Sequence, residues 1–354
     1  MNKEIDWKNV RRVLIVRLRS IGDTVLATPS LIALKRFIPD SQVDILLEDW
    51  VAPVLDGFDA VDNIIKVGKT AASRFATARQ IRHAGYDVVF NLHGGTTGTF
   101  FSYAAGAPHR VGYSHYQYKF LFNHILSSSA DFWQRPITHS AEQQLAMLGS
   151  AGVPVDDQIK TRLVVTGKAA ASLDEKFRAK AKKPLADLGG FALIHPAAAF
   201  ESKQWRAENF ARTAELLAAI GLRTVAVASG GERAVLERLQ AESEIEIACF
   251  DNLTLPEITA LASRADLFVG NDSGIAHIAA AVQTPTVVIF GSSNVDHWRP
   301  WTDAPNEIVR DETGRDIRKI DVETVAGAIW RIMEQTKKRR DAIPAAIQTF
   351  EREG

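Results

Sequence analysis

DLFVGNDSGIAHIAAAVQTPTVVIFG, residues 266–291, has the order of a strand, a tight turn, a short helix and a second strand. The apolar run 267–269 ends in the polar turn 270–274, and the small-residue stretch 275–282 leads to a second apolar run at 286–290. In an α/β sheet such a turn directs the N–H groups of the helix N-terminus beyond the carboxyl end of the strand. We therefore expect a phosphate-binding turn here.

Capping of the short helix is the alternative role for the same turn, because Asp272 and Ser273 are both good N-cap residues. His277 would lie near the same helix mouth, and capping does not require a histidine there. We therefore favour ligand binding over capping alone for this turn.

The composition indicates a globular protein with two α/β domains. The chain has 354 residues, of which 46% are hydrophobic, and its 42 Lys and Arg balance 42 Asp and Glu. A neutral total gives no electrostatic reason to expect nucleic acid as a partner. Cys249 is the single cysteine, which excludes an internal disulfide and a thiolate metal cluster, and we expect it half-buried at a strand end.

The polar start of the sequence and its strand-length first apolar run, 13–16, lead us to expect no signal peptide and no membrane-spanning helix. The expected location is the cytoplasm. A net charge of zero is compatible with local basic patches, so peripheral contact with a membrane surface remains an alternative.

A strand-then-helix rhythm runs along the chain twice. Expected strands are 13–16, 42–47, 64–67, 87–91, 191–194, 224–228 and 245–249, and expected helices are 24–37, 71–84, 139–150, 207–219, 232–241, 256–263 and 321–336. Residues 94–129 are aromatic-rich, and we expect them to be irregular. A charged run over 176–183 separates the two halves, so the expected domains are 1–183 and 184–354. The pattern predicts an α/β fold of two Rossmann-like doubly wound parallel-sheet domains that face each other across a ligand cleft.

The first strand-to-helix turn, in VLIVRLRSIGDTVLATPSLIALKRF (13–37), lacks the GxGxxG pattern of dinucleotide-binding folds. It presents Asp23 beside Gly22. A helix N-terminus stabilises a carboxylate as the anion, which leaves Asp23 able to accept a proton at neutral pH. An N-cap role for Asp23 is the alternative.

Two of these motifs carry a family resemblance. The RxRSIGDTVLATP segment at 17–29 resembles the opening of glycosyltransferase family 9, the heptosyltransferases of lipopolysaccharide core assembly. GNDSGIAHIAAA followed by TPTVVIFG resembles the donor-binding signature of that family. Between them, Lys203 in HPAAAFESKQW and Glu232 in SGGER stand where the family has donor contacts, and the similarity in order extends from about residue 11 to about 300.

The resemblance implies a GT-B fold, with the acceptor bound by residues 1–183, the nucleotide-sugar bound by 184–354, and the last helix packing back on the N-terminal domain. It also implies an inverting, metal-independent and cofactor-free transfer of heptose from ADP-heptose to a lipid-anchored inner-core acceptor of lipopolysaccharide. The resemblance further implies that the protein acts at the cytoplasmic face of the inner membrane.

The resemblance also assigns roles to residues. Asp23 falls on the position of the family's proposed general base. The implied donor contacts are Lys203 with the helix mouth at Ser273 and Gly274 for the leaving diphosphate, His277 beside the phosphates, Asp272 for sugar hydroxyls and Glu232 for the ribose. Trp205, beside Lys203, is expected to pack in the core rather than to stack on a base.

Basic residues on the N-terminal half are the acceptor candidates, since an inner-core acceptor carries carboxylates and phosphates. They are Arg17, Arg19, His93, Arg110 and His139, with Arg110 in PHRVGY the first choice. Salt bridging or capping is the alternative role for each.

The chain departs from the family pattern in its acceptor region, because residues 94–135 match no pattern for a named acceptor. A family 9 transferase that uses another nucleotide-sugar for a different surface glycan is therefore the second hypothesis. A two-domain nucleotide-binding protein without chemistry is the third, and it would have no need for Asp23.

Overall fold

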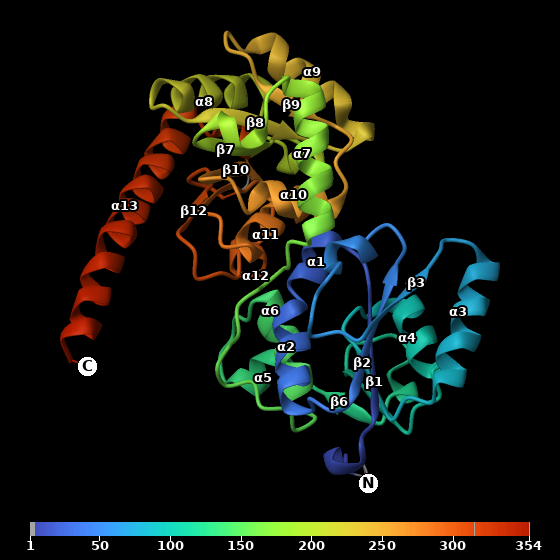
Figure 1. Cartoon of the computed structure of the whole chain (residues 1–354). Helices are drawn as coiled ribbons and strands as arrows, with labels where there is room; N and C mark the ends of the chain where they lie inside the picture. The colour runs from blue at the N-terminus through green and yellow to red at the C-terminus, as the bar shows by residue number, and fades with distance from the viewer. Residues whose placement is uncertain (1–3, 315, 354) are drawn as a thin grey trace. The chain divides into compact units, whose positions relative to one another are not determined.

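The computed structural model describes residues 4–314 and 316–353, with side chains up to residue 337. The chain divides into two compact units, 1–164 and 165–354, and each contains one six-stranded parallel sheet (Figure 1). The expected doubly wound architecture is therefore confirmed for each unit.

The sheet of the first unit has the strand order β3-β2-β1-β4-β5-β6. Its strands are β1 (Arg12–Leu18), β2 (Gln42–Glu48), β3 (Asn63–Val67), β4 (Val88–Asn91), β5 (His109–Tyr113) and β6 (His124–Leu126). The chain runs outward from β1 in one direction and from β4 in the other. Ligands of such sheets bind beyond the carboxyl ends of the strands at this switch point.

Helices cover both faces of this sheet (Figure 1). They are α1 (Ile21–Val25), α2 (Thr28–Phe37), α5 (Ser129–Trp133) and α6 (Ser140–Gly149) on one side, and α3 (Ala71–Ala84) and α4 (Gly95–Ala104) on the other. Leu14, Val16 and Val89 pack under α3 and α4 with Ile81 and Phe101. Period-two alternation turns their strand neighbours toward the opposite face.

The expectation of an irregular region at 94–129 was wrong. This region contains α4, β5 and β6, and the short α5 begins at its end. The local signals are weak because α4 has two glycines and three threonines in GTTGTFFSYA, while β6 has only three residues. Burial of Phe101 and Ser102 against the sheet fixes the helix instead.

The sheet of the second unit has the order β12-β11-β10-β7-β8-β9. Its strands are β7 (Phe191–His195), β8 (Arg223–Val227), β9 (Ala248–Phe250), β10 (Leu267–Asn271), β11 (Thr286–Ile289) and β12 (Asn306–Val309). Its helices are α7 (Gly167–Ala181), α8 (Ala207–Ala219), α9 (Arg233–Glu242), α10 (Leu255–Ala262), α11 (Gly274–Ala281), α12 (Val295–Trp298) and α13 (Val322–Glu353). Strand β12 had no sequence prediction.

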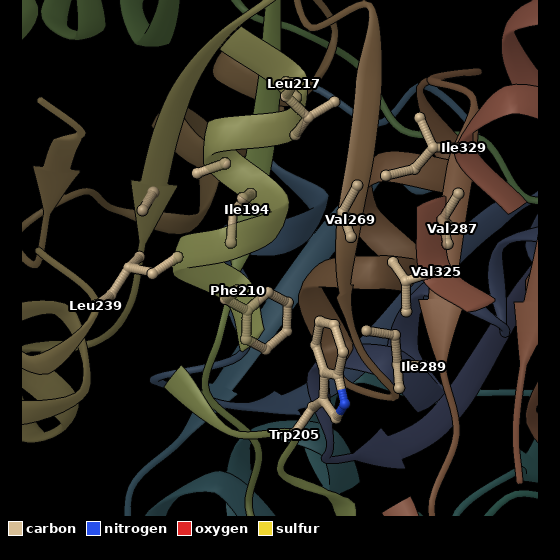
Figure 2. Close-up of a cluster of buried hydrophobic side chains, with 14 of the residues drawn as sticks. Ile194, Trp205, Phe210, Leu217, Leu239, Val269, Val287, Ile289, Val325 and Ile329 are labelled. Carbon is tan, nitrogen blue, oxygen red and sulfur yellow. The ribbon is translucent and has the colours of Figure 1, made fainter. Parts of the chain in front are cut away.

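One face of this sheet packs against α8, α9 and α13 in a large hydrophobic core, where Ile194, Val269 and Val287 meet side chains of the helices (Figure 2). Trp205 belongs to this core, with its ring edge-on to Phe210 at 5.0 Å between centroids. The expectation that Trp205 packs is confirmed.

The two units divide at residues 164 and 165, earlier than the boundary expected at 183 and 184. Residues 176–181 of the charged run are the C-terminal part of α7, a helix that belongs to the second unit and packs on its other elements. Phe177 stacks on Phe250 at 5.5 Å, and Lys176 Nζ donates to Glu257 Oε2 of α10 at 2.8 Å. The charged run therefore belongs to a helix whose other side is buried, and it does not mark a linker between the units.

Among the described residues, no helix combines the length and the apolar character that a membrane crossing needs.

Candidate functional site

An ion pair lies at the carboxyl end of β10, and one oxygen of its carboxylate is free, among the described residues, to bind a ligand. Asp272, the first residue after the strand, is buried, and its Oδ2 accepts from Lys203 Nζ at 2.8 Å and from Ser293 Oγ at 2.6 Å. Among the described residues Oδ1 has no hydrogen-bond partner. The structure therefore joins Lys203 and Asp272, which stand 69 residues apart, and leaves one carboxylate oxygen to accept from a ligand.

Gly291 lets two loops approach closely enough to hold this pair. A Cβ at Gly291, in the loop after β11, would collide with the carbonyl oxygen of Ser202. Ser292 Oγ also donates to Ser202 Oγ at 3.1 Å. The loop after β11 thus fixes the turn that carries Lys203. Sequence analysis assigned no role to Gly291, although it closes the TPTVVIFG motif.

The N-terminus of α11 lies directly beside Asp272. Ser273 is the N-cap residue, but its side chain makes no capping hydrogen bond, and its Oγ is buried without a partner among the described residues. Asp272 makes no cap bond either among the described residues, because its Oδ2 accepts from Lys203 and Ser293 and its Oδ1 accepts from neither a helix N–H nor a side chain. Side-chain capping therefore does not account for these two residues, and the N–H groups from Ser273 onward remain for a ligand. His277 is buried one turn further along α11.

Glu232 serves as a helix cap next to β8. Its Oε2 accepts from Ser229 N at 3.0 Å and from Ser229 Oγ at 2.6 Å, which closes a capping box before α9. Capping uses one oxygen of this carboxylate, and the side chain stays partly exposed.

His195 is a residue of this region that sequence analysis missed. It ends β7, is buried, and its Nδ1 lies 2.8 Å from the carbonyl oxygen of Val227, so Nδ1 carries the proton. Burial lowers the pKa of His195, against the opposing effects of that hydrogen bond and of the nearby Glu232 charge. His195 is therefore neutral at pH 7. Its position at the end of a strand was the signal that could have found it.

In the first unit, Asp23 is held by an ion pair and a capping box. Asp23 Oδ1 pairs with the Arg17 guanidinium, while Oδ2 accepts from Ser20 N at 3.2 Å and Ser20 Oγ at 2.9 Å. Asp23 is the third residue of α1 and Ser20 is the N-cap, so Asp23 is the reciprocal partner of the capping box. Its carboxylate keeps a partly exposed edge.

Arg17 serves Asp23 rather than standing free for an acceptor. The register of β1 shifts between Val16 and Leu18, and Leu18 has φ +59°, in the left-handed region. The buried Arg17 side chain lies against Asp23 and donates from Nη1 to the carbonyl oxygen of Leu92 at 2.7 Å. We conclude that Arg17 fixes the orientation of the Asp23 carboxylate.

His93, which follows β4, lies in the same neighbourhood. Burial, together with the positive charges of Arg17 and Arg19, lowers the pKa of His93 to about 4. His93 is therefore neutral at pH 7, and its Nδ1 is buried without a hydrogen-bond partner among the described residues. Arg19 is exposed, and its one ion pair among the described residues is a long one with Glu48 at 4.0 Å, so its charge is open to a ligand.

The structure does not bring Arg110 to this group. Arg110 lies in register with Val89, toward the start of β5, away from the carboxyl ends of the strands. Its Nε donates to the carbonyl oxygen of Leu121 at 2.7 Å, after β5, and its Nη1 to that of Ala107 at 2.5 Å, before β5, so it ties together the segments on either side of this strand. The first-choice acceptor residue thus has a structural role, because strand register moves it to the other half of the sheet.

His139 is the N-cap of α6. It is buried, and its Nδ1 accepts from Ala141 N at 3.1 Å, while its own N–H donates to Glu142 Oε2 at 2.8 Å. The ring is therefore engaged in capping, the alternative role named for it.

Tyr116 is a second residue, after His195, to which sequence analysis gave no role of its own; it is one of the aromatic residues of 94–129. Its hydroxyl donates to the carbonyl oxygen of Asn91 at 3.0 Å, and a Cβ at Gly94 would lie 3.0 Å from its ring. Tyr116 therefore packs over the end of β4 beside His93.

Among the described side chains, no group of three or more His, Cys, Asp or Glu is placed to hold a metal ion.

The family model and the sequence relatives that match this chain agree with one another. A family model for glycosyltransferase family 9 (heptosyltransferase) matches residues 74–324. Lipopolysaccharide heptosyltransferase 3 of Escherichia coli is 28% identical over 309 residues, which cover 80% of this chain and 85% of that protein.

Solved structures show the same fold. The E. coli ADP-heptose lipopolysaccharide heptosyltransferase II has a TM-score of 0.79 at 19% identity, over 92% of this chain and 99% of that one. The E. coli heptosyltransferase WaaC with ADP-2-deoxy-2-fluoro heptose has a TM-score of 0.70 at 20% identity, over 90% and 99%. With two parallel sheets and flanking helices, the likeness confirms the expected GT-B fold class.

Proposed function

The chain belongs to glycosyltransferase family 9, and we propose that it transfers heptose from ADP-heptose to the inner core of a lipopolysaccharide acceptor. Since members of this family are glycosyltransferases, the third hypothesis, a nucleotide-binding protein without chemistry, is set aside. The observation that carries the proposal is the family match over 74–324, which includes Lys203, Asp272 and the start of α11.

The second unit would bind the donor. Lys203 and the N–H groups at the start of α11 supply positive charge and hydrogen-bond donors suited to a diphosphate. Asp272 Oδ1 would accept from hydroxyls of the sugar, Glu232 would contact the ribose, and His277 would lie beside the phosphates. The bound ADP-2-deoxy-2-fluoro heptose of the WaaC structure supports ADP-heptose as the donor.

Asp23 would act as the general base. The acceptor hydroxyl loses its proton to Asp23 as its oxygen attacks the anomeric carbon, and the bond from that carbon to the ADP oxygen breaks on the opposite side. The product is therefore inverted at that carbon. Proton transfer of this kind contributes about 10²–10⁴ in rate. Lys203 and the α11 N-terminus would stabilise the charge on the leaving ADP, so the proposed transfer needs neither a metal ion nor a cofactor.

The first unit would bind the acceptor, with Arg19 as the main cationic contact and His93 as a neutral polar one. The acceptor is proposed to be a lipid-anchored glycan, reached by peripheral contact at the cytoplasmic face of the inner membrane. Residues 94–135 match no named acceptor pattern, which keeps a different nucleotide-sugar and surface glycan as the second candidate.

A thermal-stabilisation panel of ADP-heptose and UDP-, GDP- and dTDP-sugars in EDTA tests the donor. Ligand at 100 times Kd adds about 2.7 kcal/mol, or roughly 5–11 °C in Tm for a unit of this size. We expect ADP-heptose to give that shift and Lys203→Met to reduce it. A shift with another nucleotide-sugar and none with ADP-heptose would move the function to the second candidate.

A further inference from the structure

Five large aromatic side chains are exposed on one side of the first unit. They are Phe75 on α3, Phe100 and Tyr103 on α4, and Tyr118 and Phe120 on the segment 114–123 that joins β5 to β6. Phe75 and Phe120 expose 68% and 77% of their surface. We name this surface the aromatic face. Exposed apolar patches of this kind mark interaction sites.

The fold explains why these side chains share one side. Helices α3 and α4 lie side by side on the side of the sheet away from α2, α5 and α6 (Figure 1). Phe75 meets Phe100 at 6.5 Å between ring centroids, which joins the outer surfaces of the two helices. Thr99 Oγ1 donates to the carbonyl oxygen of Gln117 at 3.4 Å, which places the 114–123 segment beside α4.

Helical spacing puts the rings opposite the core. On α4, Phe101 and Ser102 are buried, whereas Phe100 and Tyr103 are one turn apart on the exposed side. On α3, Thr77 and Ile81 face the core and Phe75 does not. The three rings on α3 and α4 therefore point away from the core of this unit, and Tyr118 and Phe120 are exposed on the segment that joins β5 to β6. Apolar cover for these rings would have to come from outside the unit.

The same part of the chain is strongly basic, although the whole chain has a net charge of zero. Residues 63–130 contain seven Lys and Arg and one acidic residue, Asp87. Asp87 Oδ2 is occupied by the backbone N–H groups of Arg11 and Arg12, at 2.7 and 2.9 Å. None of the seven basic side chains forms an ion pair among the described residues. Arg82 and Arg110 donate to backbone carbonyl oxygens, and the other five have no side-chain hydrogen bond there either: Lys66, Lys69, Arg74, Arg79 and Lys119.

We infer that the aromatic face docks on the surface of a bilayer that contains anionic phospholipids. Aromatic rings enter the interfacial region of a membrane, and unpaired Lys and Arg beside them attract the lipid phosphates. A purely apolar protein partner would leave those charges unused, so charge complementarity favours the lipid. The inference rests on the proposed function only in that a lipid-anchored acceptor gives docking a purpose.

Sedimentation of the full chain with vesicles tests the inference, without donor and without glycan. The vesicles are phosphatidylcholine alone, or phosphatidylcholine with 30% phosphatidylglycerol. We expect binding to the mixed vesicles, at least tenfold weaker binding to phosphatidylcholine alone, and loss of most binding in 1 M salt. Any binding measured here is independent of heptose transfer, so a protein that docks but transfers nothing would defeat only the proposed function.

Two sets of variants locate the surface. The triple variant Phe75→Ser, Phe100→Ser and Phe120→Ser should bind at least tenfold more weakly. Arg79→Gln and Lys119→Gln should each weaken binding about fivefold, the effect of about 1 kcal/mol per charge.

Matched controls come from the second unit. Trp330→Ser removes a ring that is 57% exposed on α13, and Lys168→Gln and Arg223→Gln remove exposed charges. These variants should bind as the wild type does. The replaced rings of the triple variant are exposed, so its circular dichroism and Tm should match those of the wild type.

Four results of the vesicle assay would overturn the inference. They are no binding by the wild type, equal binding to both vesicle types, unchanged binding by the triple variant, or an equal loss in the Trp330→Ser control. A wild-type dimer in gel filtration that becomes a monomer in the triple variant would show that a second copy covers the face, and would also overturn it.

Discussion

Replacing Asp23 by asparagine removes the proposed base while keeping the size of the side chain. In the wild type, Oδ1 pairs with Arg17 and Oδ2 accepts from the N–H and hydroxyl of Ser20. Asparagine has one acceptor oxygen, so it retains one of these two sets of contacts and turns its NH₂ group toward the other. The variant therefore loses the charge that faces Arg17 as well as the base.

The magnitude has a kinetic part and a stability part. Loss of a general base lowers kcat by about 10²–10⁴, or about 3–5 kcal/mol of transition-state stabilisation. Leaving the buried Arg17 without its carboxylate lowers the free energy of unfolding by about 3 kcal/mol, the low end for buried pairs, because Arg17 keeps its hydrogen bond to Leu92. ADP affinity should stay within twofold, since the proposed donor contacts lie in the other unit.

Release of ADP at saturating donor and acceptor measures kcat, and calorimetric titration measures ADP affinity. Ser20→Ala is the matched control, because it removes one 2.9 Å hydrogen bond to Asp23 and leaves the carboxylate and Arg17 in place. We expect its kcat within tenfold of the wild type. The reasoning is refuted if Asp23→Asn keeps kcat within that same tenfold range, or if ADP binding is lost together with turnover.

Three further predictions concern the second unit. Lys203→Met should weaken ADP binding at least tenfold in calorimetry, because it removes the ammonium proposed to face the diphosphate; unchanged affinity would contradict that role. For Glu257, burial raises the pKa, but hydrogen bonds from Lys176 and others more than offset it and bring the pKa to about 2, against an ordinary 4.5. The carboxylate therefore stabilises the fold above about pH 4.5, and this contribution is lost as the pH falls toward 2. Urea unfolding of Glu257→Gln should show a deficit of about 3 kcal/mol at pH 7 that shrinks at pH 3, and a deficit independent of pH would argue against the ion pair. Burial raises the pKa of Cys249 to about 11, so iodoacetamide should alkylate it about a hundredfold more slowly at pH 8 than a free thiol; labelling at the free-thiol rate would show that Cys249 is not shielded.

Periodicity located most strands because they are short apolar runs between polar turns. The runs 13–16, 42–47 and 64–67 all lie in strands of the first unit. The same criterion failed for β5, whose sequence HRVGY has two polar residues and a glycine. Pairing with β4 and β6 holds β5 in the sheet, and such long-range pairing leaves no local signal.

The expected helix over 24–37 is two helices, α1 and α2, since Pro29 lies in the first turn of α2 and the chain turns at Leu26 and Ala27. Proline cannot donate to the preceding turn, which makes it a frequent first-turn residue. The break was therefore present in the sequence. It places Asp23 on a five-residue helix of its own, beside β1.

Site residues were predictable where a motif follows a strand end directly. Asp272 follows β10, and Asp23 lies on the helix that follows β1. Partners distant in sequence were not predictable, such as Arg17 bonded to Leu92 or Ser293 bonded to Asp272. They depend on which loops meet, and a single sequence does not specify that.

The most direct test of the account is transfer by the full chain with ADP-heptose, a lipid-anchored inner-core acceptor and EDTA. The account predicts release of one ADP for each heptose added to the acceptor, at an undiminished rate in EDTA, with inversion at the anomeric carbon. No ADP release under these conditions, while another nucleotide-sugar is consumed, would contradict it.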